Sequence, residues 1–177
     1  MFATLLMLAQ MAFGGTLAGV TLPDTATVGG EEVKLVGMGL REKYFIDIYV
    51  GGLYLKSPTT DGKAAIQADE PKRIVMHFIY SSVPADKMRE TYNDGFANNA
   101  DAGALKAKID KLNSYMADLT TGDEVVLDYV PGTGTTVSVK GSTKGTIEGV
   151  DFMKALFAVY LGDSPPTSKL KKGMLGG

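Results

Sequence analysis

One feature of the sequence restricts the fold most. It is the order in which the spacing of apolar residues changes along the chain. From Val20 to Lys56 apolar and polar residues alternate as in β-strands, and Gly29-Gly30 is placed as a two-residue hairpin turn between residues 26–28 and 31–36. Residues 84–119 then show apolar spacings of three and four, which predict helices, and strand-like segments follow them. Strands, helices, strands and a last helix predict an α+β fold, in which an antiparallel sheet is covered on one face.

The same patterns place the individual elements. Further strands are expected at residues 44–54, 73–80, 125–130, 135–140 and 143–147, and helices at 62–68, from 84 onward, at 105–119 and at 151–161. In the first of these strands, one apolar face carries Tyr44, Ile46, Ile48 and Val50, and a mixed face carries Phe45, Asp47, Tyr49 and Gly51. The helix at 151–161 has little polar surface, so it should be packed on most sides. A short basic helix at most follows Pro165-Pro166.

The composition excludes several classes of function. A chain of 177 residues suits one domain, and its net charge of −2 gives no field that would attract nucleic acid as a partner. The absence of cysteine excludes a disulfide, a thiolate nucleophile and a cysteine-ligated metal. His77, the only histidine, has no second soft ligand and is interpreted as a partly buried strand residue, and Gly132 and Gly134 are interpreted as part of a hairpin turn. No metal, cofactor or catalytic residue is expected.

The N-terminus has features of an export signal. Residues 1–18 carry no charge, and Phe2–Phe13 is an apolar run that is too short to span a bilayer. Small residues follow up to Ala18, so we expect a signal peptide at residues 1–18, a mature domain at 19–177, and a periplasmic or secreted protein. A buried N-terminal segment of a cytoplasmic protein and an uncleaved membrane anchor are the alternatives, because the basic start of a usual signal is missing.

Arg41 is the strongest candidate for ligand binding. It follows Gly37-Met38-Gly39-Leu40, and glycines inside a strand pattern indicate a bulge or the close approach of another group. Tyr49 stands eight residues later, so a turn between the two would place them on neighbouring strands. A guanidinium beside a phenol offers forked N–H donors and one O–H donor, which suit a carboxylate. The alternative is an Arg41 that pairs with Asp47 or Glu42 at a strand end.

Several segments together carry a resemblance to a known family. They are Gly37-Met-Gly-Leu-Arg41, Phe45-Ile-Asp-Ile-Tyr-Val-Gly-Gly-Leu-Tyr-Leu55, Leu161-Gly-Asp163 with Leu170-Lys-Lys172, and Asp128-Tyr-Val-Pro-Gly-Thr-Gly-Thr135 with Gly145-Thr-Ile-Glu-Gly149. In this order and spacing the chain resembles the chalcone isomerase-like family, particularly its exported bacterial branch, over about residues 35–176. The resemblance implies an open-faced β-sandwich, in which a large antiparallel sheet and a helical layer form a cleft.

The resemblance implies one of two functions. The family's plant enzymes cyclise chalcones at a site shaped by an Arg, a Thr, a Tyr, an Asn and a last Thr or Ser, whereas non-catalytic members bind fatty acids. Arg41 matches that arginine, and Tyr49 stands at the Thr position, so the two resemble the carboxylate-holding pair of the fatty-acid-binding members. Pro84 and Thr91 stand where the enzymes have Tyr and Asn, and Lys154 stands near the last hydroxyl. These departures favour binding over cyclisation.

We therefore expect a binding module for a fatty acid or a similar carboxylate amphiphile, with Arg41 and Tyr49 at the head group and Thr91 among the binding residues. The apolar wall is expected from Leu40, Met88, Tyr92, Phe96, Leu112, Met153 and Phe157, each of which is equally suited to plain core. The alternatives are an isomerase or lyase acting on an unsaturated phenolic substrate, and a structural protein with a closed cleft in which Arg41 pairs with Asp47. A monomer is expected, without a membrane span in the mature chain.

Overall fold

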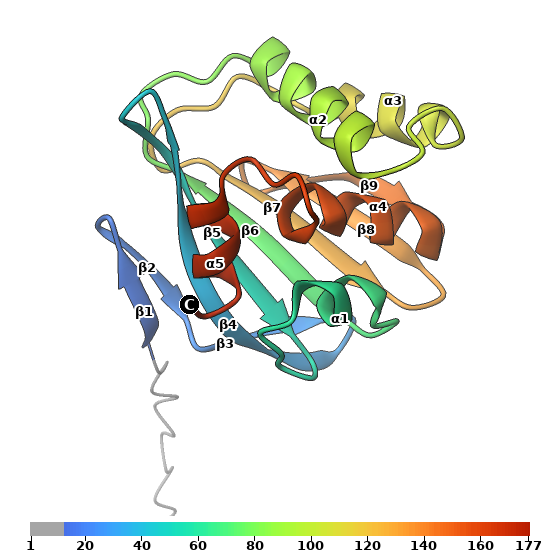
Figure 1. Ribbon diagram of the computed structural model, residues 1–177, viewed down its shortest axis with the longest axis horizontal. Helices are drawn as coiled ribbons and strands as arrows, with labels where there is room; N and C mark the ends of the chain where they lie inside the picture. Colours follow the sequence, from blue (N-terminus) through green and yellow to red (C-terminus); the bar gives the residue numbers. More distant parts are fainter. Residues whose placement is uncertain (1–12) are drawn as a thin grey trace, which may run out of the picture.

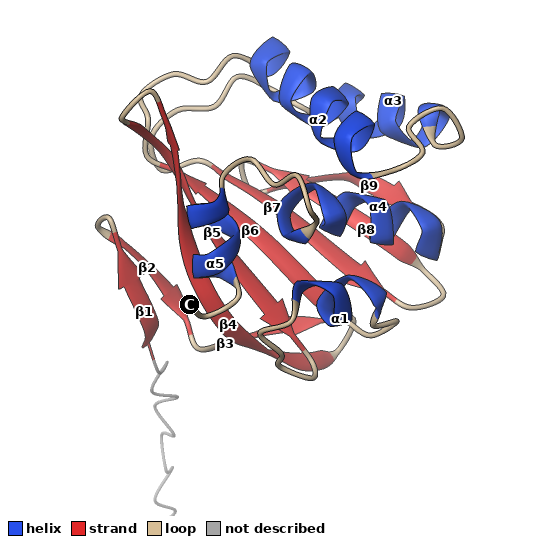
Figure 2. Ribbon diagram, viewed as in Figure 1, coloured by secondary structure: helices blue, strands red, loops and turns tan. Residues whose placement is uncertain are grey.

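Seven strands form one antiparallel sheet in which each strand lies beside its neighbours in the sequence. A computed structural model describes residues 13–177 (Figures 1 and 2). The sheet has the order β3-β4-β5-β6-β7-β8-β9, and β1 and β2 form a separate hairpin. The strands are β1 Phe13–Leu17, β2 Val20–Pro23, β3 Thr25–Val28, β4 Glu31–Lys43, β5 Ile46–Leu55, β6 Lys72–Phe78, β7 Glu124–Val130, β8 Gly134–Val139 and β9 Ser142–Ile147. The helices are α1 Gly62–Gln67, α2 Ala85–Asn99, α3 Lys106–Ser114, α4 Val150–Leu161 and α5 Ser168–Met174.

The two faces of the sheet are covered differently. Helices α1, α4 and α5 lie over one face, and α2 and α3 extend this helical layer at one end (Figure 2). Sheet residues such as Tyr49 and Leu53 join the helices in the main core. The opposite face carries a smaller cluster, in which Val50 of β5 packs together with Val20 and Leu22 of the β1–β2 hairpin. The predicted α+β class, with a large antiparallel sheet under one helical layer, is confirmed.

Most element boundaries match the predicted ones, and the second long helix is the exception. Helix α3 ends at Ser114, whereas the apolar spacing predicted a helix to residue 119. Leu119 is buried as expected, but it lies in an extended segment. Its backbone exchanges hydrogen bonds with that of Val83, at N–O distances of 2.8 and 2.9 Å. Leu119 therefore ties the chain after α3 to the segment that precedes α2.

The long hairpin of β4 and β5 carries the first two candidate residues. Its turn is Tyr44-Phe45, so these two aromatic residues lie outside the strand in which they were predicted. A bulge between Arg41 and Glu42 shifts the register, so that Arg41 lies opposite Tyr49 and not opposite Ile48. Directly opposite residues of an antiparallel pair point to the same face. The bulge therefore brings Arg41 and Tyr49 together on the helical side of the sheet.

The glycines of β4 allow helix α5 to pack directly on this strand. A Cβ atom at Gly39 would overlap the backbone carbonyl of Leu170, and one at Gly37 would overlap that of Gly173. Backbone atoms cannot turn aside as a side chain can, so only glycine permits this contact. The close approach that was predicted from these glycines is made by α5.

Two predictions outside the candidate site are confirmed. The Nδ1 atom of His77 in β6 lies 2.9 Å from a carboxylate oxygen of Glu124 in β7, which is the environment of a partly buried strand residue. Gly132 has a φ of 75° in the turn between β7 and β8, and Gly134 begins β8. This segment is a hairpin connection, as predicted.

The predicted signal peptide covers residues 1–18, of which residues 1–12 lie outside the described part of the chain. Residues 13–17 form β1, which pairs with β2, so cleavage after Ala18 would remove β1. The signal peptide and its cleavage site stay predictions. In residues 13–177, no helix is both long enough and apolar enough to cross a membrane.

Candidate functional site

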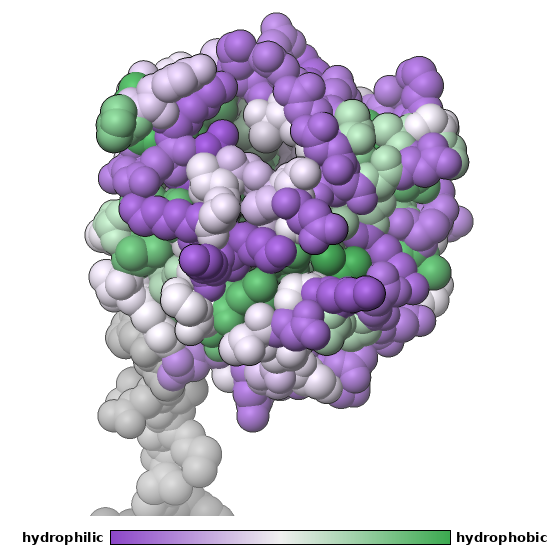
Figure 3. Space-filling model, viewed as in Figure 1, coloured by the Kyte–Doolittle hydropathy of each residue, from purple (hydrophilic) through white to green (hydrophobic). Residues whose placement is uncertain are grey.

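A cavity of about 260 Å³ lies between the helical face of the sheet and helix α2. Figure 3 shows a hollow beneath α2 with a largely polar rim. The deep part of the wall is apolar. Met76 and Phe78 of β6 lie on the side of the sheet, and Met88 of α2 and Val159 of α4 lie on the side of the helices. All four of these side chains are buried, so the cavity offers an apolar group shelter from water.

Tyr49 presents its phenol to this cavity. Its side chain is 6% exposed, and its ring packs against that of Phe78 at a centroid distance of 5.2 Å. Within residues 13–177 the Tyr49 hydroxyl has no hydrogen-bond partner, although it lines the cavity. Burial raises the pKa of Tyr49, and the Arg41 guanidinium opposes that shift only in part. The phenol is therefore a neutral donor that is free for a bound acceptor.

Arg41 lies opposite Tyr49 and has no carboxylate partner in the described part of the chain. Its guanidinium donates to the backbone carbonyl of Glu42. The Glu42 carboxylate is bound instead by Lys169 of α5, at 3.0 Å. Arg41 is one of the residues that line the cavity, and a guanidinium has further N–H groups from which an anion can accept. The arrangement in which Arg41 pairs with Asp47 or Glu42 is therefore not found.

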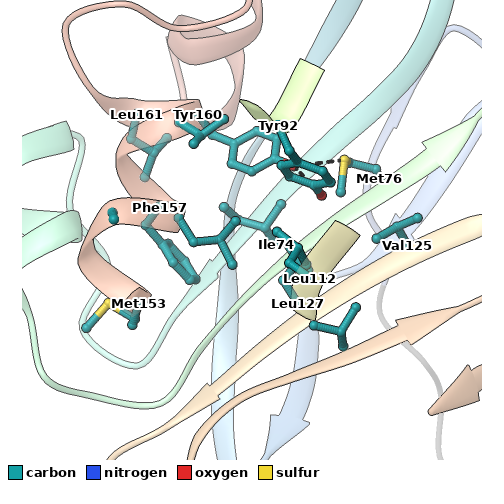
Figure 4. Close-up of a cluster of buried hydrophobic side chains, with 14 of the residues drawn as sticks. Ile74, Met76, Tyr92, Leu112, Val125, Leu127, Met153, Phe157, Tyr160 and Leu161 are labelled. Atoms are coloured by element: carbon teal, nitrogen blue, oxygen red, sulfur yellow. Dashed lines mark hydrogen bonds between the residues drawn. The ribbon is translucent and has the colours of Figure 1, made fainter. Parts of the chain in front are cut away.

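Two further buried phenols belong to the cavity wall. The hydroxyls of Tyr160 in α4 and Tyr92 in α2 are hydrogen-bonded at 2.9 Å, and the Tyr160 hydroxyl also lies 3.2 Å from the sulfur of Met76 (Figure 4). The single O–H of Tyr160 can serve only one of these two acceptors, so the two tyrosines and Met76 form one small hydrogen-bonded cluster. Burial raises the pKa of Tyr92 to about 12 and also raises that of Tyr160 well above its usual value. Tyr160 was not among the predicted binding residues, since a helix buried on most sides gives no signal that separates a cavity residue from core.

The structure brings some of the predicted binding residues together and separates others. The predicted residues that line the cavity are Arg41, Tyr49, Met88, Thr91 and Tyr92. Thr91 lies at the exposed rim, where its hydroxyl donates to the carbonyl of Lys87 at 2.8 Å within α2. Thr91 can therefore offer a ligand mainly the acceptor side of its oxygen.

Leu40, Met153 and Phe157 do not line the cavity, which corrects their predicted place in its wall. Leu40 precedes Arg41 in β4, so it points to the opposite face of the sheet and joins the smaller core cluster there. Met153 and Phe157 lie on α4 nearer its start than Tyr160, where the core is filled (Figure 4). Both are fully buried. Phe96 and Leu112 are likewise core residues.

Charged groups gather at the rim of the cavity. Lys87 and Glu90 of α2 form an ion pair at 2.8 Å, and Lys43 of β4 and Asp94 of α2 also lie in the rim. Pro84 precedes α2 and adds no polar side chain. No group of three or more His, Asp or Glu side chains within residues 13–177 is placed to hold a metal ion. The site thus combines the Arg41 guanidinium and the free phenol donor of Tyr49 with an apolar interior, a set that can hold an anionic head group and an apolar tail.

The buried tyrosines predict a loss of stability at alkaline pH. Burial raises the folded-state pKa of Tyr54 and Tyr92 to about 12, against about 10 in an unfolded chain. Between these two values the folded state keeps protons that the unfolded state has released, so the free energy of unfolding falls as the pH rises from 10 towards 12. Urea unfolding at several pH values should show this fall, and Tyr92→Phe should make it shallower. An equally steep fall in that variant would mean that Tyr92 ionises without being buried as described.

Comparisons with known proteins identify the family. The model of a family described as chalcone isomerase-like matches residues 14–176. Among solved structures, that of a fatty-acid binding protein from Arabidopsis thaliana matches with a TM-score of 0.69 and 17% sequence identity, over 89% of this chain and 92% of that chain. At this identity the match shows a shared fold. A search of curated proteins found no match to the chain. Because the family model spans nearly all of the sequence, the protein belongs to the chalcone isomerase-like family.

Proposed function

We propose that the protein binds a fatty acid or a similar carboxylate amphiphile in the cavity between the sheet and α2. One observation carries the proposal: an Arg41 guanidinium without a carboxylate partner in residues 13–177 lies opposite the buried phenol of Tyr49 at an apolar cavity. A carboxylate would accept forked bonds from Arg41 and one bond from Tyr49.

The expected affinity comes mainly from the apolar tail. At about 0.8 kcal/mol per buried methylene, a tail of roughly a dozen carbons gives on the order of 10 kcal/mol before the costs of association. The head group adds about 1.5 to 3 kcal/mol for each charged hydrogen bond, so its main effect is to fix orientation. The cavity volume of about 260 Å³ suits one chain rather than two.

The family and the predicted export signal extend the proposal. The matching Arabidopsis structure is named as that of a fatty-acid binding protein, so the same fold can hold such a ligand. The apolar run at residues 2–13 supports a periplasmic or secreted protein, and the resemblance to the exported bacterial branch of the family supports a bacterial source. We therefore place the proposed binding outside the cytoplasm.

Native mass spectrometry of gently purified protein tests both parts of this proposal. We expect acyl species bound to the wild-type protein, and an affinity for a dissolved fatty acid that is about ten to a hundred times lower in Arg41→Ala. Tyr49→Phe should weaken binding less, because it removes one neutral donor. The intact mass in the same spectra gives the mature N-terminus.

Lys56→Ala is the matched control for Arg41→Ala. It removes one positive charge at the far end of β5, where Lys56 is exposed and pairs with Glu31 at 2.7 Å. This variant should bind the fatty acid as the wild type does. The proposal is wrong if the wild-type protein stays empty under conditions in which a known lipid-binding protein retains its ligand, or if Arg41→Ala and Lys56→Ala bind equally well.

A further inference from the structure

The turn between β4 and β5 differs from the other two-residue hairpin turns in residues 13–177. These turns, each with a positive φ at both residues, are Ala18-Gly19, Gly29-Gly30, Tyr44-Phe45 and Lys140-Gly141. Three of them have glycine at the second position, where it avoids the steric cost that other residues meet. The β4–β5 turn has aromatic residues at both positions, with φ values of 50° and 64°. Two bulky residues at positive φ strain the backbone of the turn. Because such strain clusters at functional positions, it indicates that these two side chains have a function.

The same two side chains are strongly exposed. Tyr44 is 85% exposed and Phe45 is 104% exposed, and the next residue, Ile46, is 43% exposed. We call Tyr44, Phe45 and Ile46 the aromatic tip. The tip lies at the free end of the β4–β5 hairpin (Figure 1). Lys43, just before the tip, and Ile48, two residues after it, line the cavity. The aromatic tip therefore stands beside the mouth of the cavity without being part of its wall.

We propose that the aromatic tip inserts into the interface of a phospholipid bilayer and holds the cavity mouth against the membrane. Aromatic side chains favour this interface, because their rings are buried while a hydroxyl such as that of Tyr44 stays at the level of the head groups. The ammonium of Lys43 lies 5.8 Å from the centroid of the Tyr44 ring, which places a positive charge behind the inserted ring. Such an attachment is peripheral and needs no membrane-spanning helix.

The size of the aromatic tip favours a bilayer over a protein partner. Two aromatic side chains offer roughly 300 to 500 Å² together, whereas a stable protein interface buries about 800 Å² on each partner. A bilayer needs no complementary surface, since each ring gains from its own burial. The tip also ends a narrow hairpin, so it can enter an interface without the rest of the sheet.

The charges behind the tip suit lipid phosphates. Arg41 and Lys43 form no ion pair with a carboxylate in the described part of the chain, and Lys169 binds the carboxylate of Glu42 at 3.0 Å. On the hairpin itself, Asp47 is the remaining carboxylate near the tip. At the base of the tip three cations, counting Lys169, face two carboxylates, and the rim of α2 adds one cation and two carboxylates, so the region has no net charge. Lys43, beside the Tyr44 ring, is the cation placed to meet a lipid phosphate.

The inference rests on the proposed function in one respect. A ligand with a long apolar tail resides in membranes, and this is the reason why the cavity mouth should meet one. Docking and ligand binding are nevertheless separable. Docking is measured with delipidated protein and vesicles, and ligand binding with a dissolved fatty acid in the absence of vesicles. Loss of one with retention of the other shows which of the two proposals has failed.

The first experiment uses Phe45→Trp. The chain contains no tryptophan, so this variant carries one fluorescent indole at the tip. With vesicles of phosphatidylcholine and phosphatidylglycerol we expect the emission to shift to shorter wavelength and to be quenched by lipids that carry a quencher in the acyl region. An emission spectrum that vesicles leave unchanged would overturn the proposal. A shift that depends on protein concentration without lipid would assign the tip to contact between copies of this chain instead.

The second experiment replaces the turn by Tyr44→Asn/Phe45→Gly. Asn-Gly is a preferred sequence at two positive φ values, so the variant should fold with equal or greater stability while it lacks both rings. Sedimentation with the same vesicles should show binding at least about tenfold weaker than that of the wild type. Binding of dissolved fatty acid should be unchanged, because neither residue lines the cavity.

Lys140→Asn is the matched control for the altered turn. It creates the same Asn-Gly sequence in the β8–β9 turn, and it should leave vesicle binding within about twofold of the wild type, since it removes only one exposed charge. Equal vesicle binding by the wild type and Tyr44→Asn/Phe45→Gly would overturn the proposal. The proposal would also be overturned if Tyr44→Asn/Phe45→Gly and Lys140→Asn lost vesicle binding to the same extent. Such a result would mean that the overall charge of the protein surface, and not the aromatic tip, determines the binding.

Discussion

Replacing Phe96 by alanine should lower the free energy of unfolding by about 3 to 5 kcal/mol. Phe96 is fully buried, and its ring stacks on that of Phe152 in α4 at a centroid distance of 5.7 Å. Only Met88, Tyr92 and Phe96 are buried in α2, so the change removes one of the three side chains that hold this helix to the core. Urea unfolding followed by circular dichroism measures the loss. Because α2 is one wall of the cavity, we also expect fatty-acid binding to weaken.

Phe45→Ala is the control for this prediction. It deletes the same atoms from a side chain that is 104% exposed, so the free energy of unfolding should change by no more than about 0.5 kcal/mol. Similar losses in Phe96→Ala and Phe45→Ala would show that α2 is not packed on α4 as described.

Gly39→Ala should cost about 3 kcal/mol of stability and loosen helix α5. The added Cβ would overlap the backbone carbonyl of Leu170, so α5 or β4 has to move. A displaced α5 would take Lys169 away from Glu42, and the freed carboxylate could then bind Arg41. We therefore expect weaker binding of a fatty acid together with faster hydrogen exchange of the α5 amides, measured by mass spectrometry.

Gly103→Ala is the matched glycine substitution. A Cβ atom at this position would lie 3.5 Å from the nearest atom of Asp101, which is an ordinary contact, and the backbone needs no positive φ there. Stability should be unchanged or rise slightly. Protection of the α5 amides that is the same in Gly39→Ala and Gly103→Ala would contradict the close packing of α5 on β4.

The sheet could be predicted because its strands alternate and most of its turns have local signals. Gly29-Gly30, for example, marks the β3–β4 turn directly. Tyr44-Phe45 carries no such signal, since aromatic residues are uncommon at positive φ, and this turn was predicted as strand. The end of α3 was missed for another reason. The bridge between Leu119 and Val83 is a tertiary contact, and apolar spacing alone cannot reveal it.

The candidate site could be predicted only in part. The glycines before Arg41 and the resemblance to a family pointed to Arg41 and Tyr49, but the bulge that places both on one face has no separate sequence signal. The alternation of neighbouring strand residues would have excluded Leu40 from the face of Arg41. Nothing in the spacing of α4 distinguishes Tyr160, which lines the cavity, from Phe157, which does not.

The contact between α5 and β4 has a consequence for the timing of folding. Residues 168–174 of α5 pack on β4, which is synthesised more than a hundred residues earlier. Lys169 of α5 also forms an ion pair with the carboxylate of Glu42, the residue next to Arg41. The packing of α5 on β4, which supports the hairpin that carries Arg41, is therefore completed only after almost the whole polypeptide has been synthesised.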